Sequence, residues 1–313
     1  MGGGSFSATD WTTYASTTAS RAAAPTTAHL YKSRSIHEDL NPSKIKNGIR
    51  ESRDVAGKKE SIPFAFFLDV TGSMSFVLDE IARKGLGTLG TEMLNADRKF
   101  PFDPQMLFGA IGDVESDRSP LQVTQFEADN RIVDQILKFH LEGNGGGNSY
   151  ESYTLGWYFC AMNTTTDAYE KRGKKGYLFT VGDELPTPLL RAKHINQFIE
   201  GAGAQADFTA KQLLEMVSQR WNVYHLIVEE GSNGKDTRVH KAWRELLGQR
   251  AILLSDHKAM AETIISIIQI NEGEATAAAE VAATWSGDTA LVVAAATKDL
   301  VKGSSSTEAV TVF

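Results

Sequence analysis

The feature of this sequence that most constrains its fold is the alternation of short apolar runs with segments of helical periodicity. Continuous apolar runs occupy residues 64–68, 106–111, 177–181, 223–228 and 251–254. Helical patterns lie near 76–93, 129–140, 189–199, 207–220, 237–247 and 257–270. Apolar runs of this length are typical of strands that are buried on both faces, as in parallel sheets. Because parallel strands need long crossovers, which helices supply, the pattern predicts an α/β fold with a doubly wound, mostly parallel sheet of about six strands.

The two ends of the chain differ in composition from its middle. Residues 1–28 are rich in Ser, Thr, Ala and Gly, so we expect 1–61 to form a flexible arm followed by a polar strap. Residues 273–313 are rich in Ala, Ser and Thr and are expected to form an extension outside the core. The domain itself is expected to span 62–272. Within it, apolar and polar residues alternate over 121–126, which predicts an antiparallel edge strand.

Composition and charge argue against several classes of protein. A net charge of −7 at pH 7 is unfavourable for a protein that binds nucleic-acid phosphates. No apolar stretch reaches the roughly 18 residues of a membrane span, and the N-terminus lacks a signal-peptide pattern, so we expect a cytoplasmic protein, or one of the host cytoplasm or virion if the chain is viral. The single cysteine, Cys160, lies in an apolar run and is expected to be a buried thiol. The seven histidines show no zinc-ligand spacing.

Oxygen-bearing side chains follow three of the expected strands or helices at loops that should meet at one edge of the sheet. The first loop carries Asp69, Thr71 and Ser73 at alternate positions, and Asp183 follows the strand at 177–181. The loop at 142–149 is glycine-rich, and Asn148, Ser149 and Glu151 lie at its end. Ligands of open parallel sheets bind beyond the carboxyl ends of the strands, and ligands that are all oxygens favour a hard cation such as Mg²⁺.

The first of these loops carries a resemblance to a known family. Asp69-Val70-Thr71-Gly72-Ser73-Met74 resembles the D-x-S/T-G-S metal-ion-dependent adhesion site of von Willebrand factor A-type domains, and the resemblance covers roughly residues 62 to 270. It implies a Rossmann-like fold in which Asp69, Thr71, Ser73 and Asp183 hold the ion, Asp183 directly or through water.

The second-loop ligand is left open by the resemblance. The family usually offers a Thr after two glycines, and here the nearest candidates are Asn148, which we favour, and Ser149. The loop also resembles a G-G-G-D form that is followed by a glutamate, which would be Glu151. Asp113, Glu115 and Asp117 follow the strand at 106–111 and are expected near the rim of the same site.

The resemblance implies a binding function and no catalysis. In such domains the Mg²⁺ ion, or in its place Mn²⁺ or Ca²⁺, keeps an open position that an acidic side chain of a protein partner completes. Proteins resembling this family inside cells often act as adaptors for AAA-type ATPases or as assembly factors, so we expect a protein partner, with neither nucleic acid nor membrane.

Three other interpretations stay open. Asp69 or Thr71 could simply cap the helix that follows. Asp69-Val70-Thr71-Gly72-Ser73 also resembles the D-K-T-G-T motif of haloacid dehalogenase-like phosphotransferases, in which the first Asp is the nucleophile and Mg²⁺ neutralises charge. Finally, the low-complexity ends would suit a structural component of a viral (phage) particle or large complex. Truncation of both ends should then leave the core folded but prevent assembly.

Overall fold

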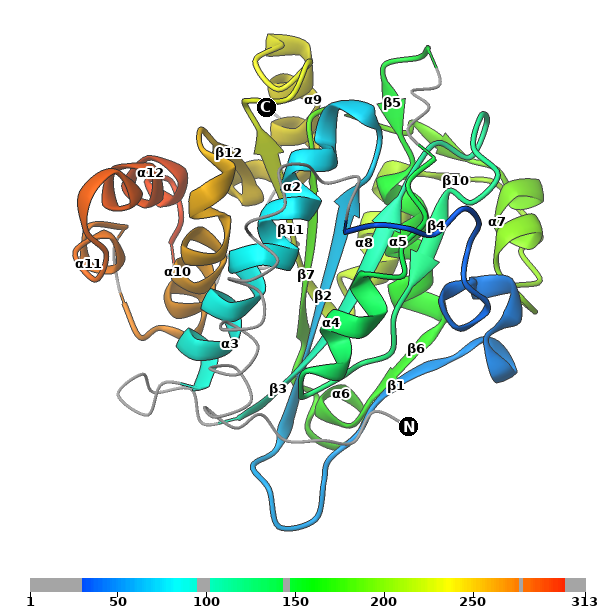
Figure 1. Cartoon of the computed structure of the whole chain (residues 1–313), viewed down its shortest axis with the longest axis horizontal. Coiled ribbons are helices and arrows are strands. Elements are labelled where there is room, and N and C mark those ends of the chain that lie inside the picture. Colours follow the sequence, from blue (N-terminus) through cyan, green and yellow to red (C-terminus); the bar gives the residue numbers. More distant parts are fainter. Residues whose placement is uncertain (1–29, 95–101, 143–146, 276–277, 302–313) are drawn as a thin grey trace.

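The computed structural model describes residues 30–94, 102–142, 147–275 and 278–301. Its central feature is a six-stranded sheet in the order β12-β11-β7-β2-β3-β4 (Figure 1). The strands are β2 (Ser61–Asp69), β3 (Asp103–Ile111), β4 (Leu121–Val123), β7 (Gly176–Gly182), β11 (Trp221–Val228) and β12 (Ala251–Leu254). All neighbours are parallel except β4, which pairs antiparallel with β3 at one edge. The predicted mixed α/β fold with a mostly parallel sheet and one antiparallel edge strand is therefore confirmed.

The helices lie between and after the strands. In chain order they are α2 (Ser75–Glu80), a π-helical segment Ile81–Gly85, α3 (Leu86–Leu94), α4 (Arg131–Ile136), α5 (Tyr153–Met162), α6 (Asp167–Arg172), α7 (Ala192–Phe198), α8 (Ala210–Val217), α9 (Thr237–Leu247), α10 (Met260–Glu272), α11 (Ala278–Ala282) and α12 (Gly287–Thr297). Short 3₁₀ helices span Glu38–Leu40, Pro42–Lys44, Lys46–Gly48, Gly72–Met74, Gly248–Arg250 and His257–Ala259. Among the residues described, no helix is long and apolar enough to cross a bilayer.

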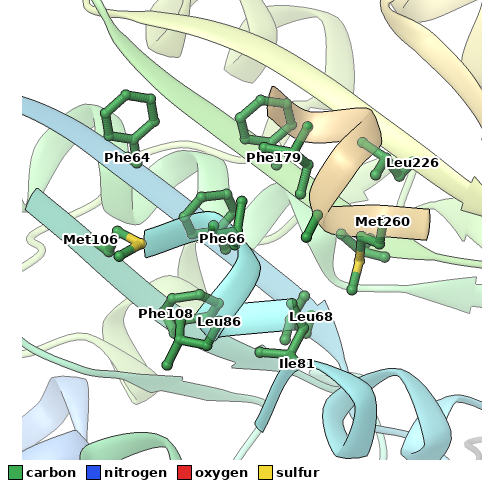
Figure 2. Close-up of a cluster of buried hydrophobic side chains, with 14 of the residues drawn as sticks. Phe64, Phe66, Leu68, Ile81, Leu86, Met106, Phe108, Phe179, Leu226 and Met260 are labelled. Atoms are coloured by element: carbon green, nitrogen blue, oxygen red, sulfur yellow. The ribbon is translucent and has the colours of Figure 1, made fainter. Parts of the chain in front are cut away.

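Alternate residues of β2 supply two separate cores, because successive side chains of a strand point to opposite faces. Phe64, Phe66 and Leu68 belong to the first core, where α2, α3, α4 and α10 cover the sheet. Figure 2 shows Phe66 between Phe108 of β3 and Phe179 of β7, with Met260 of α10 close by. Both faces of β2 are thus sealed from water.

The second core lies on the other face of the sheet. Ala65 and Phe67 pack there with residues of α5, α8 and α9. The predicted buried thiol, Cys160 of α5, is in this core and fully buried, and burial raises its pKa well above the usual range. Each large apolar side chain buried in this way contributes roughly 1.5–3 kcal/mol relative to exposure.

Three small two-stranded sheets, with strands of two or three residues each, lie outside the main sheet. β1 (Arg50–Ser52) pairs with β6 (Thr164–Thr166), β5 (Tyr150–Glu151) with β8 (Leu185–Pro186), and β9 (Leu189–Leu190) with β10 (Phe208–Thr209). The first of these attaches the predicted strap to the domain. Residues 1–29, including the predicted arm at 1–28, lie outside the described residues.

The C-terminal segment departs from the expectation that 273–313 lies outside the core. α11 and α12 pack against each other and against α10, and Val281, Val293, Ala296 and Leu300 are buried in the first core (Figure 1). The physical reason is that α10 carries apolar side chains beyond the face that it turns to the sheet, and residues 260–270 are all buried, so its other side needs a cover. Residues 302–313, with the serine run at 304–306, lie outside the described residues.

Candidate functional site

Asp69 is the last residue of β2, where the chain leaves the sheet at its carboxyl edge. Its Oδ1 accepts hydrogen bonds from the Thr71 backbone N–H (2.8 Å) and from the Thr71 hydroxyl (2.6 Å). Its Oδ2 accepts one from the Tyr153 hydroxyl of α5 (3.0 Å). Both Asp69 and Thr71 are buried. This short turn leads through the 3₁₀ helix Gly72–Met74 into α2, so the D-x-T motif is held rigidly at a strand-to-helix junction.

Asp183 follows the neighbouring strand, β7, and is fully buried. Its Oδ2 accepts a hydrogen bond from the Asn233 backbone N–H (2.9 Å), whereas its Oδ1 is buried without a partner. Two glycines make room for this arrangement. A Cβ at Gly182 would overlap the Tyr153 hydroxyl, and one at Gly231 would lie 2.5 Å from Cγ of Asp183. Tyr153 can approach β7, and Asp183 can approach Gly231, because Gly182 and Gly231 have no side chain.

Two glutamates join these aspartates. Glu151 is 2% exposed, and its Oε2 has no hydrogen-bond partner. Pairing of β5 with β8 sets Glu151 opposite Pro186, which places it near Glu184. Oε1 of Glu184 accepts from Asn233 Nδ2 (3.3 Å), while its Oε2 is buried and unpartnered. We call Asp69, Glu151, Asp183 and Glu184 the carboxylate cluster.

The electrostatics of the carboxylate cluster show a surplus of negative charge. Burial, and then the charge of Asp183, raise the pKa of Asp69 to about 6, although its hydrogen bonds from Thr71 act in the opposite direction. Burial, and then the charges of Asp69 and Glu184, raise the pKa of Glu151 to about 10. Burial followed by the charge of Asp69 raises the pKa of Glu184 to about 7, and burial also raises the pKa of Asp183.

Within the described part of the chain, no positive side chain pairs with these carboxylates. Among the residues that the structure describes, no Lys, Arg or His nitrogen lies within 4.0 Å of a carboxylate oxygen of the cluster. Buried carboxylates without a counter-ion are costly, and each unpartnered oxygen adds a desolvation penalty of about 1–3 kcal/mol. The arrangement therefore favours uptake of a cation or of protons.

The rim of the site is built from the loop after β3. Asp113 and Asp117 lie near enough for their charges to raise the pKa of Glu151, as expected from the sequence. Asn148 is exposed and donates from Nδ2 to Oδ2 of Asp113 (2.7 Å), while its Oδ1 accepts from the Tyr150 N–H (3.1 Å). Asn148 is thus held at the rim by Asp113, and the second-loop side chain buried within the cluster is Glu151.

Of the residues singled out from the sequence, the structure brings Asp69, Thr71 and Asp183 together. The side chain of Ser73 and the glycines at 143–146 lie outside the described part of the chain. Sequence reasoning mentioned Glu151 without choosing it as a ligand, and it missed Glu184 and Tyr153. The signal for Glu151 was its position after the three glycines. Nothing in the sequence pattern alone distinguishes Glu184 or Tyr153.

The cluster is spread out, and a second group of possible ligands is tighter. This second group consists of Glu230, Asp256 and His257. One ligand atom of each lies within 4.8 Å of those of the other two, and no other such group of His, Cys, Asp or Glu occurs among the described residues. There, however, His257 Nδ1 lies 2.7 Å from Oε2 of Glu230, which is exposed, so the two groups already satisfy each other. A spread cluster with unpartnered oxygens suits Mg²⁺, which keeps several of its own waters.

No protein-family model matches the chain, and no curated protein matches it. Among solved structures, the chain is similar to the pilus adhesin SpaC from Lactobacillus rhamnosus GG. For its open conformation the sequence identity is 9% and the TM-score 0.42, and the match covers 69% of this chain and 31% of that chain. For a second crystal structure of the adhesin the sequence identity is 11% and the TM-score 0.47, and the match covers 71% of this chain and 32% of that chain. The chain thus spans about a third of the adhesin's length. So distant a likeness carries no argument about function.

Proposed function

We propose that this chain is a doubly wound von Willebrand factor A-type domain that holds one divalent cation and uses it to bind a protein partner. The observation that carries the proposal is the carboxylate cluster at the carboxyl ends of β2 and β7, with unpartnered oxygens on Glu151, Asp183 and Glu184 and no basic side chain paired with them among the residues described. The strand order supports it, since β2 and β7 are neighbours whose loops meet at this edge.

The donor set fits a hard cation. Asp69, Thr71, Glu151 and Asp183 would hold it through oxygens alone, which is the chemistry of Mg²⁺, with Mn²⁺ or Ca²⁺ as alternatives. The Thr71 hydroxyl donates a hydrogen bond to Oδ1 of Asp69, so the lone pairs of the hydroxyl oxygen remain available to an ion. A bound cation supplies positive charge to ionised carboxylates and an open position for an incoming oxygen ligand.

The partner would supply that oxygen from an acidic side chain, as in the resembled family. A carboxylate that reaches a cation forms a directional contact that depends on the metal. An AAA-type ATPase or an assembly subunit is the kind of partner that this interpretation suggests. The alternative of a structural component of a particle stays a prediction, since residues 1–29 and 302–313 lie outside the described part.

A phosphotransferase mechanism is less well supported by the same geometry. A nucleophilic aspartate must present a free oxygen to the phosphorus atom. Asp69 is fully buried, and both of its oxygens accept hydrogen bonds, from Thr71 and from Tyr153. Thr71 cannot act as a general acid in the manner of a carboxyl group at that position. We therefore propose a binding domain that is not an enzyme.

The first test is calorimetric titration of the metal-free protein with Mn²⁺ and Mg²⁺, together with melting curves. We expect saturable binding and a melting temperature raised by about 5 °C at a hundredfold excess over Kd, because ligand at that excess adds about 2.7 kcal/mol. Glu151→Gln should weaken binding about tenfold or more, because it removes a charged ligand. Asn148→Ala is the matched control from the same loop and should change the affinity by less than about threefold.

Two results would contradict the assignment. An absence of metal binding by the wild type would remove the cation from the proposal, and a larger loss from Asn148→Ala than from Glu151→Gln would return the second-loop role to Asn148. Partner chemistry is tested by panning a display library of short peptides on Mg²⁺-loaded protein, with Asp69→Ala as counter-selection. Enrichment of peptides with Asp or Glu is expected, and enrichment that persists in EDTA would refute metal-dependent binding.

A further inference from the structure

A second polar site lies between the strap and the sheet, away from the carboxylate cluster. A surface cavity of about 910 Å³ lies here. It is lined by several strap residues between Glu38 and Glu51 and by Gln125, Gln135 and Lys138. We call it the strap cavity. The strap loop that borders it contains Asn47, the one described non-glycine residue with a left-handed backbone (φ 61°). Neither the proposed metal site nor its rim includes any of these residues.

Arg50 of β1 is a buried basic residue in the wall of the strap cavity, and its hydrogen bonds are incomplete. It is 5% exposed, yet among the described residues no carboxylate oxygen lies within 4.0 Å of its guanidinium. Its Nη2 donates to the backbone oxygens of Asp39 and Val123, the latter at 2.9 Å. Its Nε is buried and has no hydrogen-bond partner. Burial lowers the pKa of Arg50 to about 10, against the charges of Asp39 and Glu127.

Such a residue is unusual because a guanidinium stays charged and is costly to bury unpaired. The described carboxylates of the cavity wall, Glu38, Asp39 and Glu51, form no ion pair with it. Glu51 is paired with Arg53 (2.7 Å), and the carboxylate of Asp39 lies 4.0 Å from Lys138. Lys44 and Lys46 also line the cavity, and neither forms an ion pair with a described carboxylate. Three cations without an ion pair to a described carboxylate thus border one polar cavity, which Glu38, Asp39 and Glu51 also line.

We propose that the strap cavity binds an oxyanion, the phosphate or carboxylate group of a ligand, with Arg50 as its anchor and Lys44 and Lys46 at its entrance. A planar guanidinium with a free N–H is well suited to phosphate and carboxylate oxygens. The flanking amides of Gln125 and Gln135 offer neutral hydrogen-bonding groups for the rest of the ligand. Because β1 holds the strap to β6, binding there would also stabilise the attachment of the strap.

The test is an NMR titration that follows the Nε–Hε resonance of Arg50 in protein stripped of metal on a chelating resin. The probes are inorganic phosphate and glutarate, with sodium chloride at equal ionic strength as reference. A saturable shift of the resonance with phosphate alone would assign a phosphoryl ligand, and one with glutarate alone a carboxylate ligand. Chloride should produce no saturable shift. Removal of metal prevents phosphate from binding through a cation at the carboxylate cluster, so the two proposals fail independently.

Variants separate the anchor from general charge. Arg50→Met should abolish the binding measured by calorimetry, and Lys44→Gln with Lys46→Gln should weaken it about tenfold while the Arg50 resonance remains observable. The matched control is Lys211→Gln with Lys298→Gln, two exposed lysines elsewhere, which should leave the affinity unchanged. If Arg50→Met does not fold, the lysine variants still decide. No saturable shift with either probe at millimolar concentrations, or equal losses in both lysine pairs, would overturn the proposal.

Discussion

Acidic side chains gather at both ends of β2, but in opposite electrostatic settings. At the amino end, around Ser61, Asp54 and Asp167 contact Arg53, Lys171 and Arg172 at 2.7–3.3 Å. We call these five residues the amino-end network. At the carboxyl end, the carboxylate cluster around Asp69 has no basic partner among the described residues. The first group lowers the pKa of its carboxyls through hydrogen bonds to basic side chains, and the second raises them through burial.

This difference separates structural charge from functional charge. The amino-end network pairs its carboxylates within the chain: Arg172 donates to Asp54 (2.8 Å) and to the Ser61 carbonyl (2.8 Å), and Asp54 accepts from the Ser61 N–H (3.0 Å), although Nε of Arg172 is buried without a hydrogen-bond partner. These contacts hold the start of β2, and each of the two carboxylates has a basic partner. The carboxylate cluster is incomplete, since buried oxygens of Glu151, Asp183 and Glu184 have no partner. A site that is incomplete in this way is a candidate for binding.

The largest effect is expected from closing the space that the carboxyl-end site requires. In Gly182→Ala the new methyl group would overlap the Tyr153 hydroxyl, which holds Oδ2 of Asp69. We expect a loss of roughly 3 kcal/mol from overpacking and loss of Mn²⁺ binding. Gly87→Ala, in α3 with open space around the position, is the control and should be neutral or stabilising. Chemical denaturation and calorimetry measure both, and intact metal binding in Gly182→Ala would contradict the assigned geometry.

A smaller effect is expected from breaking the amino-end network. Asp167 is buried and accepts from Arg53, from Lys171 and from the Asp54 N–H (2.9 Å), so Asp167→Asn should cost about 1–2 kcal/mol. The loss should be equal with and without Mg²⁺, because this network lies at the other end of the strand. Glu151→Gln is the counterpart, and it should raise the melting temperature of the metal-free protein while reducing the response to Mg²⁺. Denaturation with and without metal distinguishes them, and a Mg²⁺-dependent loss in Asp167→Asn would break the comparison.

The smallest effect is expected in the pH dependence of stability. Folding raises the pKa of Asp69 to about 6 and of Glu184 to about 7, so the folded state holds these protons more tightly than the unfolded state. Their stabilisation is complete below the unfolded pKa of roughly 4 and is lost as pH rises through the folded pKa. We therefore expect the metal-free melting temperature to fall between about pH 5 and about pH 8, and Mg²⁺ to reduce the fall.

At acidic pH, the amino-end network decides whether the melting temperature rises or falls with pH. The pKa of Asp54 and of Asp167 is lowered on folding, so their contribution is present above roughly pH 4 and lost below it. Melting curves over the whole range, with and without Mg²⁺ at equal ionic strength, separate the two ends of β2. A metal-free melting temperature that is constant or rises from about pH 5 to about pH 8 would show that the carboxylate cluster is not strained by its charge.

Much of the fold could be predicted because its signals are local. The apolar run at 223–228 lies within β11 (Trp221–Val228), and the helical pattern at 237–247 coincides with α9 (Thr237–Leu247). What could not be predicted depends on contacts between distant segments. The C-terminal segment looked unconstrained by its Ala-rich composition, yet α12 packs where α10 offers an apolar face. Short pairings such as β1 with β6 have too few residues to leave a periodic pattern.

The candidate site divides in the same way. The sequence by itself determined that Asp69 and Thr71 lie in one turn, because residues two apart interact through the backbone that joins them. It also determined that Asp183 follows a buried strand, because the apolar run before it is local. Only the tertiary structure decided that Glu151 lies inside and Asn148 at the rim, since that depends on β5 pairing with β8 and on Asp113. It also decided which charges are paired. A carboxylate's neighbours through space set its pKa and its need for a cation, and those neighbours come from strands and helices far apart in the chain.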